Sequence, residues 1–253
     1  MQKLTALKNV AGTVVRKVVK SLRLRGLWGS LRLGSKKLLK AVRFQSRSAP
    51  DYDRHGAQFD LEHGTDTRQS SDPGWLGRLT SLNWIYGQAY HPAAVDAVQK
   101  AFEQLPAEFR DATFIDMGSG KGRILLLASR MQFRRVIGVE YDPLLHQIAA
   151  SNVARFNAPE KARIELNCRD ATEYPLPGGP LVIFFHHPFD SPVFKIVCSR
   201  LTAAANAGQQ ISVTYFDPKC RDVLDANPVF ESHHEFRATT RDDVSYVIYR
   251  TRS

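Results

Sequence analysis

Short apolar runs and segments of helical periodicity alternate from Pro92 to the end of the chain, and this alternation limits the possible folds most. Strands are predicted where β-branched and aromatic residues follow one another, and helices where apolar residues recur every three or four positions. The predicted strands cover residues 113–117, 135–141, 162–168, 180–185 and 210–216. The predicted helices cover residues 93–105, 122–131, 143–157, 191–205 and 221–226. Strands that alternate with helices favour right-handed crossovers, so the pattern predicts a doubly wound α/β fold with a mostly parallel sheet.

The last two strand-like segments, residues 229–237 and 244–250, have no helix between them. A turn-like stretch joins them directly, which predicts an antiparallel hairpin at one edge of the sheet. This C-terminal hairpin completes a predicted seven-stranded sheet. The run 180–185 (PLVIFF) is apolar throughout, which is typical of a strand covered by helices on both faces.

The first 50 residues account for the positive charge of the chain. They contain 13 Lys and Arg and no Asp or Glu, whereas the other 203 residues contain 22 basic and 25 acidic residues. Apolar residues recur at helical spacing, with basic residues on the other side of the same helical wheel. Residues 1–45 are therefore predicted to be a cationic amphipathic helical extension.

Four interpretations of this leader stay open. It could contact an anionic membrane surface, with Trp28 at the boundary, or it could be a cleaved organellar transit peptide. It could also bind nucleic acid, or pack on the body with a solvated basic face. We favour peripheral membrane contact over nucleic acid. The chain has no apolar stretch long enough to span a bilayer. Its three cysteines contain no C-x-x-C pair, which favours a reducing, cytoplasmic location without a bound metal, with organellar import as the alternative.

Residues 46–84 are polar and rich in turn-forming residues, so they are predicted to be a linker or lid before a domain at residues 85–253. Within them, Phe59, Asp60 and Asp66 belong to the stretch FDLEHGTDT. Two interpretations carry equal weight: a lid that excludes water from a ligand, or a surface loop held by Asx turns.

Three glycines, Gly118, Gly120 and Gly122, lie at the turn from the first predicted strand to the helix after it. Glycine permits left-handed backbone angles and lets a ligand approach the main chain closely. Asp116 precedes the first glycine by two residues, where its carboxylate can hold a cationic amino group. Glu140 ends the next strand, where an acid can accept hydrogen bonds from both hydroxyls of a ribose.

Four motifs resemble those of class I S-adenosylmethionine-dependent methyltransferases, over about residues 90–250. They are FIDMGSGKGR, VIGVEYDP, CRDATEYPLP and FFHHPFD. The resemblance implies a Rossmann-like fold and S-adenosyl-L-methionine as cofactor. It implies that Asp116 and the glycine loop hold the methionine part, that Glu140 holds the ribose, and that Tyr141, Asp170 and Ala171 meet the adenine. The full implied cofactor set is Tyr90, Asp116, Met117, Gly118, Ser119, Gly120, Gly122, Glu140, Tyr141, Asp170, Ala171 and His186.

A narrower resemblance is to small bacterial methyltransferases in which an F-D-x-x-x-G-x-D-T stretch precedes a Y-x-P element and a GSGKGR loop. The stretch at residues 59–67 and Tyr90-His91-Pro92 match that layout. The implied function is methyl transfer to an N or O acceptor, a small molecule or a protein side chain, at a membrane surface if the leader binds there. A non-catalytic cofactor-binding module is the alternative. An NAD-dependent oxidoreductase is disfavoured because the third glycine comes one residue early.

His187 stands where related enzymes have the Asn of an N-P-P-[FY] motif. We expect either that it acts as a general base, or that one of the two adjacent histidines only lines the pocket. Lys121 and Arg123 could meet the cofactor carboxylate or an acidic substrate, but solvated positions in the first helical turn are favoured.

Overall fold

The computed structural model describes residues 54–68, 81, 83, 86–159, 163–239 and 243–252. The leader predicted over residues 1–45 lies outside this part of the chain. The helices are α2 (Arg54–His63), α4 (Val95–Glu103), α5 (Arg123–Ser129), α6 (Pro143–Arg155), α7 (Ser191–Asn206) and α8 (Asp222–Asp225), with a 3-10 turn, η3 (Ala107–Phe109). The strands are β1 (Thr113–Met117), β2 (Arg135–Glu140), β3 (Ile164–Cys168), β4 (Leu181–His186), β5 (Ile211–Phe216), β6 (Phe230–Phe236) and β7 (Tyr246–Thr251).

The strands form one seven-stranded sheet in the order β3-β2-β1-β4-β5-β7-β6. All neighbouring pairs from β3 to β5 are parallel, and β7 runs antiparallel to both β5 and β6. The predicted fold class, a mostly parallel sheet with a C-terminal antiparallel hairpin, is confirmed. Every strand and helix predicted between residues 93 and 251 is present, with ends shifted by a few residues.

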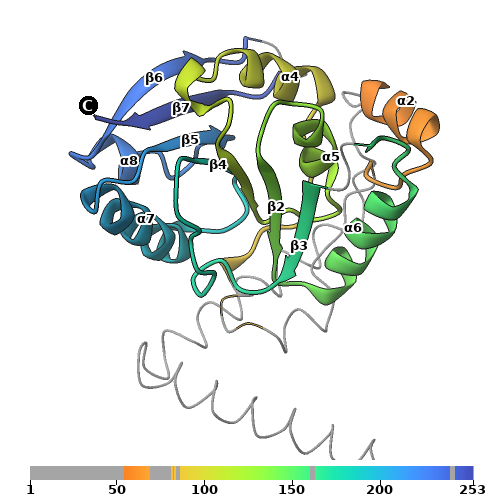
Figure 1. The fold of residues 1–253 in the computed structure, drawn as a ribbon, viewed down its shortest axis with the longest axis horizontal. Coiled ribbons are helices and arrows are strands. Elements are labelled where there is room, and N and C mark those ends of the chain that lie inside the picture. The colour runs from red at the N-terminus through yellow and green to blue at the C-terminus, as the bar shows by residue number, and fades with distance from the viewer. Residues whose placement is uncertain are drawn as a thin grey trace, which may run out of the picture.

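Helices cover both faces of this sheet (Figure 1). Phe114 of β1 lies in the core shared with α4 and α5, whereas Ile115 and Met117 of the same strand lie in the core shared with α7. Successive side chains of a strand point to opposite faces, so a central strand must be apolar at nearly every position. This burial on both faces is why residues 181–185 of β4 form a continuous apolar run, and why β1, β2 and β5 are buried at nearly every position.

The sheet changes winding direction between β1 and β4. From β1 the chain adds β2 and β3 on one side, and it then returns to add β4 and β5 on the other side. Because the parallel strands end at the same edge, the loops after β1 and β4 separate there and leave a crevice. Ligands of doubly wound folds bind at such a switch point.

Helix α2 lies inside residues 46–84, the segment predicted to be a linker or lid, and packs on the body. The ring of Phe59 stacks on Phe156 at 6.2 Å between centroids, and the ring of His63 meets Phe156 edge-on at 4.9 Å. Gly64 follows the helix with φ +63°, a common helix ending. The local sequence gives little helical signal. The helix is stabilised instead by contacts with residues distant in sequence, such as Phe156.

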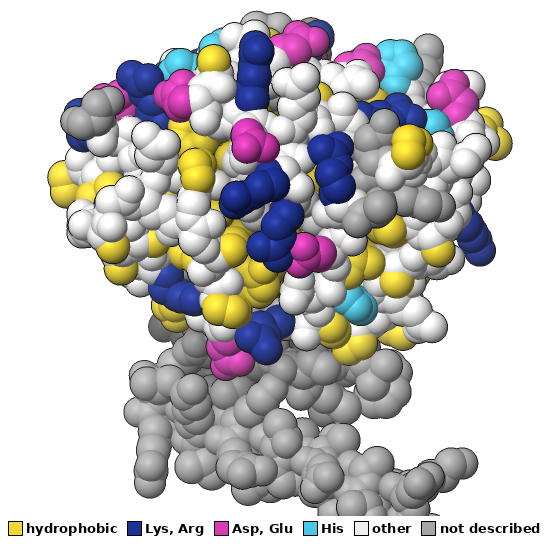
Figure 2. Space-filling model, viewed as in Figure 1, with side chains coloured by type: hydrophobic (Ala, Val, Ile, Leu, Met, Phe, Trp, Pro, Cys, Tyr) yellow, Lys and Arg dark blue, Asp and Glu magenta, His cyan; other side chains and the backbone are white. Residues whose placement is uncertain are grey.

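Charged side chains of both signs are interspersed over the face of the body that Figure 2 displays. Some exposed charges of the body are paired: the Arg135 guanidinium donates to the exposed carboxylate of Glu165 at 2.7 and 2.8 Å. Among the residues that the structure describes, no helix is both long and apolar enough to cross a bilayer.

Candidate functional site

A cleft opens at the switch point, at the carboxyl ends of β1, β2 and β4. Ten of the residues predicted to bind a cofactor line it: Tyr90, Asp116, Gly118, Ser119, Gly120, Glu140, Tyr141, Asp170, Ala171 and His186. His91, Arg123 and Arg169 also line it. The sequence had suggested Arg123 as one possible contact of the cofactor carboxylate, whereas His91 and Arg169 were missed. Met117 is in the core and Gly122 is the N-cap of α5, and neither lines the cleft.

The glycine loop is in contact with the chain above it. Gly118 has φ +93°, and a Cβ atom placed there would lie 2.3 Å from the Cβ atom of Pro188. Gly120 has φ +52°, and its Cβ atom would lie 2.2 Å from the ring of Tyr90. Both positions therefore require glycine for backbone conformation and for space. The loop leaves main-chain groups exposed to the cleft.

Two buried carboxyl groups stand at the ends of β1 and β2. Asp116 is 2% exposed and Glu140 is 4% exposed. The Glu140 carboxylate accepts hydrogen bonds from the backbone N–H groups of Gly120 at 2.9 Å and Asp142 at 2.8 Å. Glu140 thereby ties the glycine loop to the end of β2.

Burial controls the ionisation of both acids. Desolvation raises the pKa of Glu140 to about 7, against the opposing effect of its backbone hydrogen bonds. Desolvation and the nearby charge of Glu140 raise the pKa of Asp116 well above its ordinary value. A pair of acids held in this way favours a cationic ligand, which would restore charge to both carboxylates.

The segment before α4 crosses the cleft and is fixed to the loop after β4. Gln88 N–H donates to the Pro188 carbonyl at 2.9 Å, and Asp190 N–H donates to the Tyr86 carbonyl at 2.7 Å. Gly87 lies against the Tyr141 ring, since a Cβ atom there would be 2.8 Å from the Tyr141 hydroxyl. The predicted ligand residues Tyr90 and Tyr141 are thus brought together by this segment.

Asp170 also anchors this region. Its carboxylate accepts hydrogen bonds from the Ser81 hydroxyl and from Asn83 Nδ2 at 2.9 Å. It further accepts from the backbone N–H of Thr172 at 2.9 Å and from its hydroxyl at 2.7 Å. A ligand amino group at Asp170 would have to share these acceptor sites.

The two adjacent histidines point to opposite faces of the sheet. His187 has a left-handed φ of 38°. Its Nδ1 atom lies 2.9 Å from the hydroxyl of Tyr215, a core residue. The residue is not part of the cleft lining. The structure therefore does not bring the predicted base to the cleft. His186 does line the cleft, and desolvation lowers its pKa to about 4, so this imidazole is neutral at pH 7. In the described residues, no group of three or more His, Cys, Asp or Glu is arranged to hold a metal ion.

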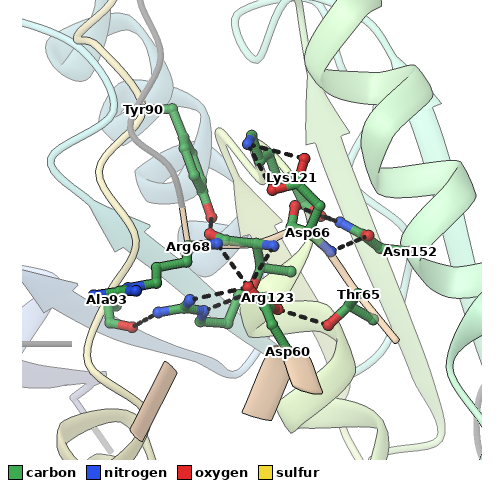
Figure 3. A network of polar contacts seen from close by, with 10 residues as sticks. Asp60, Thr65, Asp66, Arg68, Tyr90, Ala93, Lys121, Arg123 and Asn152 are labelled. Atoms are coloured by element: carbon green, nitrogen blue, oxygen red, sulfur yellow. Dashed lines mark hydrogen bonds and ion pairs between the residues drawn. The ribbon is translucent and has the colours of Figure 1, made fainter. Parts of the chain in front are cut away.

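Lys121 and Arg123 are buried, which corrects the expectation that they are solvated (Figure 3). Lys121 is 4% exposed, and its ammonium group lies 3.2 Å from the Asp66 carboxylate. Asn152 of α6 donates to the backbone carbonyls of Asp66 at 3.0 Å and Lys121 at 2.9 Å. The segment after α2 covers these two cations, and nothing local in the GSGKGR motif signals this cover.

Thr67 forms hydrogen bonds with Asp60, Tyr90 and Arg123, three of the residues that Figure 3 labels in the same polar network. Its hydroxyl accepts a hydrogen bond from Arg123 Nε at 2.8 Å and donates one to the Asp60 carboxylate at 2.7 Å. Its backbone carbonyl accepts from the Tyr90 hydroxyl at 2.7 Å. Residues 60–67, Tyr90 and the glycine loop therefore form one unit. In the sequence, this unit was signalled by the joint occurrence of the F-D-x-x-x-G-x-D-T stretch, the Y-x-P element and the GSGKGR loop.

No protein-family model and no curated protein matches the chain. Several solved structures do resemble it. An rRNA methylase from Streptococcus thermophilus is 10% identical, with 61% of this chain and 95% of that chain covered and a TM-score of 0.45. A Streptococcus mutans protein in complex with SAH is 10% identical, with 61% and 97% covered and a TM-score of 0.46. A ribosomal protein L11 methylase from Lactobacillus delbrueckii subsp. bulgaricus is 17% identical, with 62% and 78% covered and a TM-score of 0.45.

Proposed function

We propose that the chain is an S-adenosylmethionine-dependent methyltransferase that methylates an N or O acceptor. The observation that carries this proposal is the meeting of Asp116 and Glu140 with the glycine loop in one cleft. The donor carries a positive sulfonium and ammonium group at its methionine end and a ribose with two hydroxyls. A buried acid at the end of each strand suits these two parts.

The residues present fit such a donor at four places. Gly118 and Gly120 line the cleft with main-chain atoms alone, so the donor would contact the backbone of the loop directly. Asp116 would hold the ammonium group, and Glu140 would accept the ribose hydroxyls in addition to its two backbone N–H groups. Tyr141 would lie beside the adenine. When bound, the sulfonium supplies an activated methyl group and a neutral leaving group.

The contribution of the chain to the reaction is then mainly the positioning of donor and acceptor. The end of β4 provides the acceptor side of the cleft, where His186, Pro188 and Phe189 line the wall. The neutral imidazole of His186 can donate one hydrogen bond to a methyl-acceptor molecule bound there, or accept one from it. His187 is not assigned this role, because its ring lies against Tyr215.

Donor binding is expected to weaken as the pH falls below about 7. The pKa of Glu140 is raised to about 7 and that of Asp116 is raised as well, so acid protonates the groups that attract the donor. The raised pKa of Glu140 also affects the stability of the ligand-free protein. Its contribution to the free energy of unfolding is fully present below pH 4.5 and is lost as the pH rises through 7. We expect affinity for S-adenosylmethionine to drop about tenfold between pH 8 and pH 6, and less in Glu140→Gln. Calorimetric titration at the two pH values checks this, and equal affinities would contradict it.

Methyl transfer itself is tested with S-adenosylmethionine labelled in its methyl group, incubated with the full chain and a cell extract. The proposal predicts enzyme-dependent incorporation of label, lost in Asp116→Asn. Donor binding without incorporation would favour the non-catalytic binding module. Binding of NAD in preference to S-adenosylmethionine would favour an oxidoreductase.

A further inference from the structure

The carboxylate of Asp170, at the end of the cleft that the resemblance assigns to the adenine, is already engaged by the chain itself. Oδ1 accepts hydrogen bonds from the backbone N–H of Thr172 at 2.9 Å and from its hydroxyl at 2.7 Å. Oδ2 accepts from the Ser81 hydroxyl and from Asn83 Nδ2 at 2.9 Å. An ionised carboxylate offers about four acceptor positions. Four donors of the chain therefore fill the acceptor positions of Asp170.

The two oxygens of Asp170 serve different parts of the chain. Oδ1 closes a local turn, in which the Glu173 N–H also donates to the Asp170 carbonyl at 3.0 Å. Arg200 of α7 holds the same turn, because its guanidinium donates to the carbonyls of Thr172 at 2.9 Å and Tyr174 at 2.6 Å. The turn is thus a fixed base from which Oδ2 binds another segment.

That segment, Ser81, Asn83 and residues 86–90, is here called the strap, and it is held on both sides of the cleft. On one side it donates to Asp170, which follows β3. On the other side Gln88 donates to residues that follow β4, from its N–H to the Pro188 carbonyl at 2.9 Å and from its side chain to Asp190 at 2.5 Å. Since β2 and β1 lie between β3 and β4, the two ties stand on either side of the strands that carry the buried acids.

We propose that Asp170 is a positioning residue that anchors the strap over the donor, and that it does not bind the 6-amino group of the adenine. The inference rests on the proposed function and concerns how that site holds its donor. It departs from the role that the resemblance implies for Asp170. An amino group at this carboxylate would have to displace one of four donors, and displacing Ser81 or Asn83 would release the strap.

Two ligands that differ only at the purine separate the two roles. One is S-adenosylhomocysteine, and the other is its 6-deamino analogue, in which a hydrogen atom replaces the 6-amino group. A carboxylate that binds the amino group would favour the first ligand, and its substitution would remove that preference. A positioning residue would affect both ligands by the same factor, because both lie under the same strap. The ratio of the two dissociation constants is therefore the decisive quantity.

Asp170→Asn in the full chain is the first variant. The substitution keeps the shape of the side chain but replaces one acceptor oxygen by an amide NH₂ group, which weakens the ties to the turn and the strap. We expect both ligands to bind about tenfold more weakly, since a hydrogen bond to a charged group contributes on this scale. Their ratio should stay within about twofold of the ratio for the unmodified chain. A ratio that changes tenfold would overturn the inference.

Ser81→Ala is the second variant, and the two roles predict opposite results for it. It removes one of the four donors and leaves the charge of Asp170 in place. If Asp170 bound the adenine, the vacated position would be available to the amino group, and S-adenosylhomocysteine would bind as tightly or more tightly. The inference predicts about fivefold weaker binding of both ligands. It also predicts faster hydrogen exchange of the Gln88 amide, because the strap is held less firmly. Unchanged or tighter binding of S-adenosylhomocysteine would contradict it.

Ser212→Ala is the matched control. Ser81 and Ser212 are both buried, and the Ser212 hydroxyl donates one hydrogen bond, to the Tyr249 carbonyl at 3.1 Å. Ser212 lies near the amino end of β5, whereas the cleft lies at the carboxyl ends of the parallel strands. The control should leave both affinities and the exchange of Gln88 unchanged. Failure of the unmodified chain to bind S-adenosylhomocysteine would remove the proposed function, whereas a changed ratio in a chain that binds it would overturn only the role of Asp170.

Discussion

Replacing Gly118 by alanine is expected to destabilise the fold by about 2–5 kcal/mol and to abolish donor binding. A left-handed backbone costs a residue with a Cβ atom about 1–2 kcal/mol, and overpacking adds about 1–3 kcal/mol. Both costs apply, because Gly118 has φ +93° and its Cβ atom would lie 2.3 Å from Pro188. Pro188 would have to move, and with it the loop that holds residues 86–90.

Gly208→Ala separates the two costs. Gly208 has nearly the same backbone angle, φ +87°, but a Cβ atom there meets nothing within 4 Å. This control should lose only the backbone contribution, about 1–2 kcal/mol, and should bind the donor normally. Denaturant unfolding with calorimetric titration checks both variants. Equal destabilisation by the two substitutions would contradict the packing of Gly118 against the loop after β4.

Asp116→Asn is expected to lower the affinity for S-adenosylmethionine about 100-fold without destabilising the empty protein. The loss corresponds to about 3 kcal/mol for a buried ionic hydrogen bond. The empty protein should be as stable or more stable at pH 8, because burial raises the pKa of Asp116 and the ionised form is therefore costly there. Loss of binding together with a gain in stability is characteristic of a residue kept for its ligand.

Asp225→Asn should give the opposite result. Asp225 accepts hydrogen bonds from Tyr249 at 2.6 Å and Arg221 at 2.8 Å on α8, away from the cleft. Its neutralisation should reduce the free energy of unfolding by about 1 kcal/mol and leave donor affinity unchanged. If Asp116→Asn bound the donor within threefold of the unmodified chain, Asp116 would not be a ligand residue.

The strands and the glycine turn could be predicted from the sequence because their signals are local. A run such as 181–185 is apolar at every position, and its burial on both faces of a parallel sheet requires that. Asp116 and Glu140 could be selected for the same reason, since each ends a predicted strand and parallel strands end at one edge. The predicted parallel topology was enough to place Asp116, Glu140 and the glycine turn at one cleft, because parallel strands end at the same edge of a sheet.

The support of the cleft could not be predicted, because it joins segments that are distant in sequence. Thr67 lies 56 residues before Arg123, and Asp66 lies 86 residues before Asn152. A charged residue in a first helical turn is usually solvated, so the burial of Lys121 and Arg123 depends on a cover that only the fold shows. The direction of His187 likewise depends on one left-handed backbone angle, which the sequence of two adjacent histidines does not reveal.

The central claim is that the cleft at the ends of β1, β2 and β4 binds S-adenosylmethionine. Calorimetric titration of the full chain with S-adenosylmethionine, S-adenosylhomocysteine and NAD tests it most directly. The account predicts saturable binding of the first two, weakened in Glu140→Ala, and no binding of NAD. Absence of binding by both sulfur ligands, or binding that is unaffected by Glu140→Ala and Asp116→Asn, would contradict it.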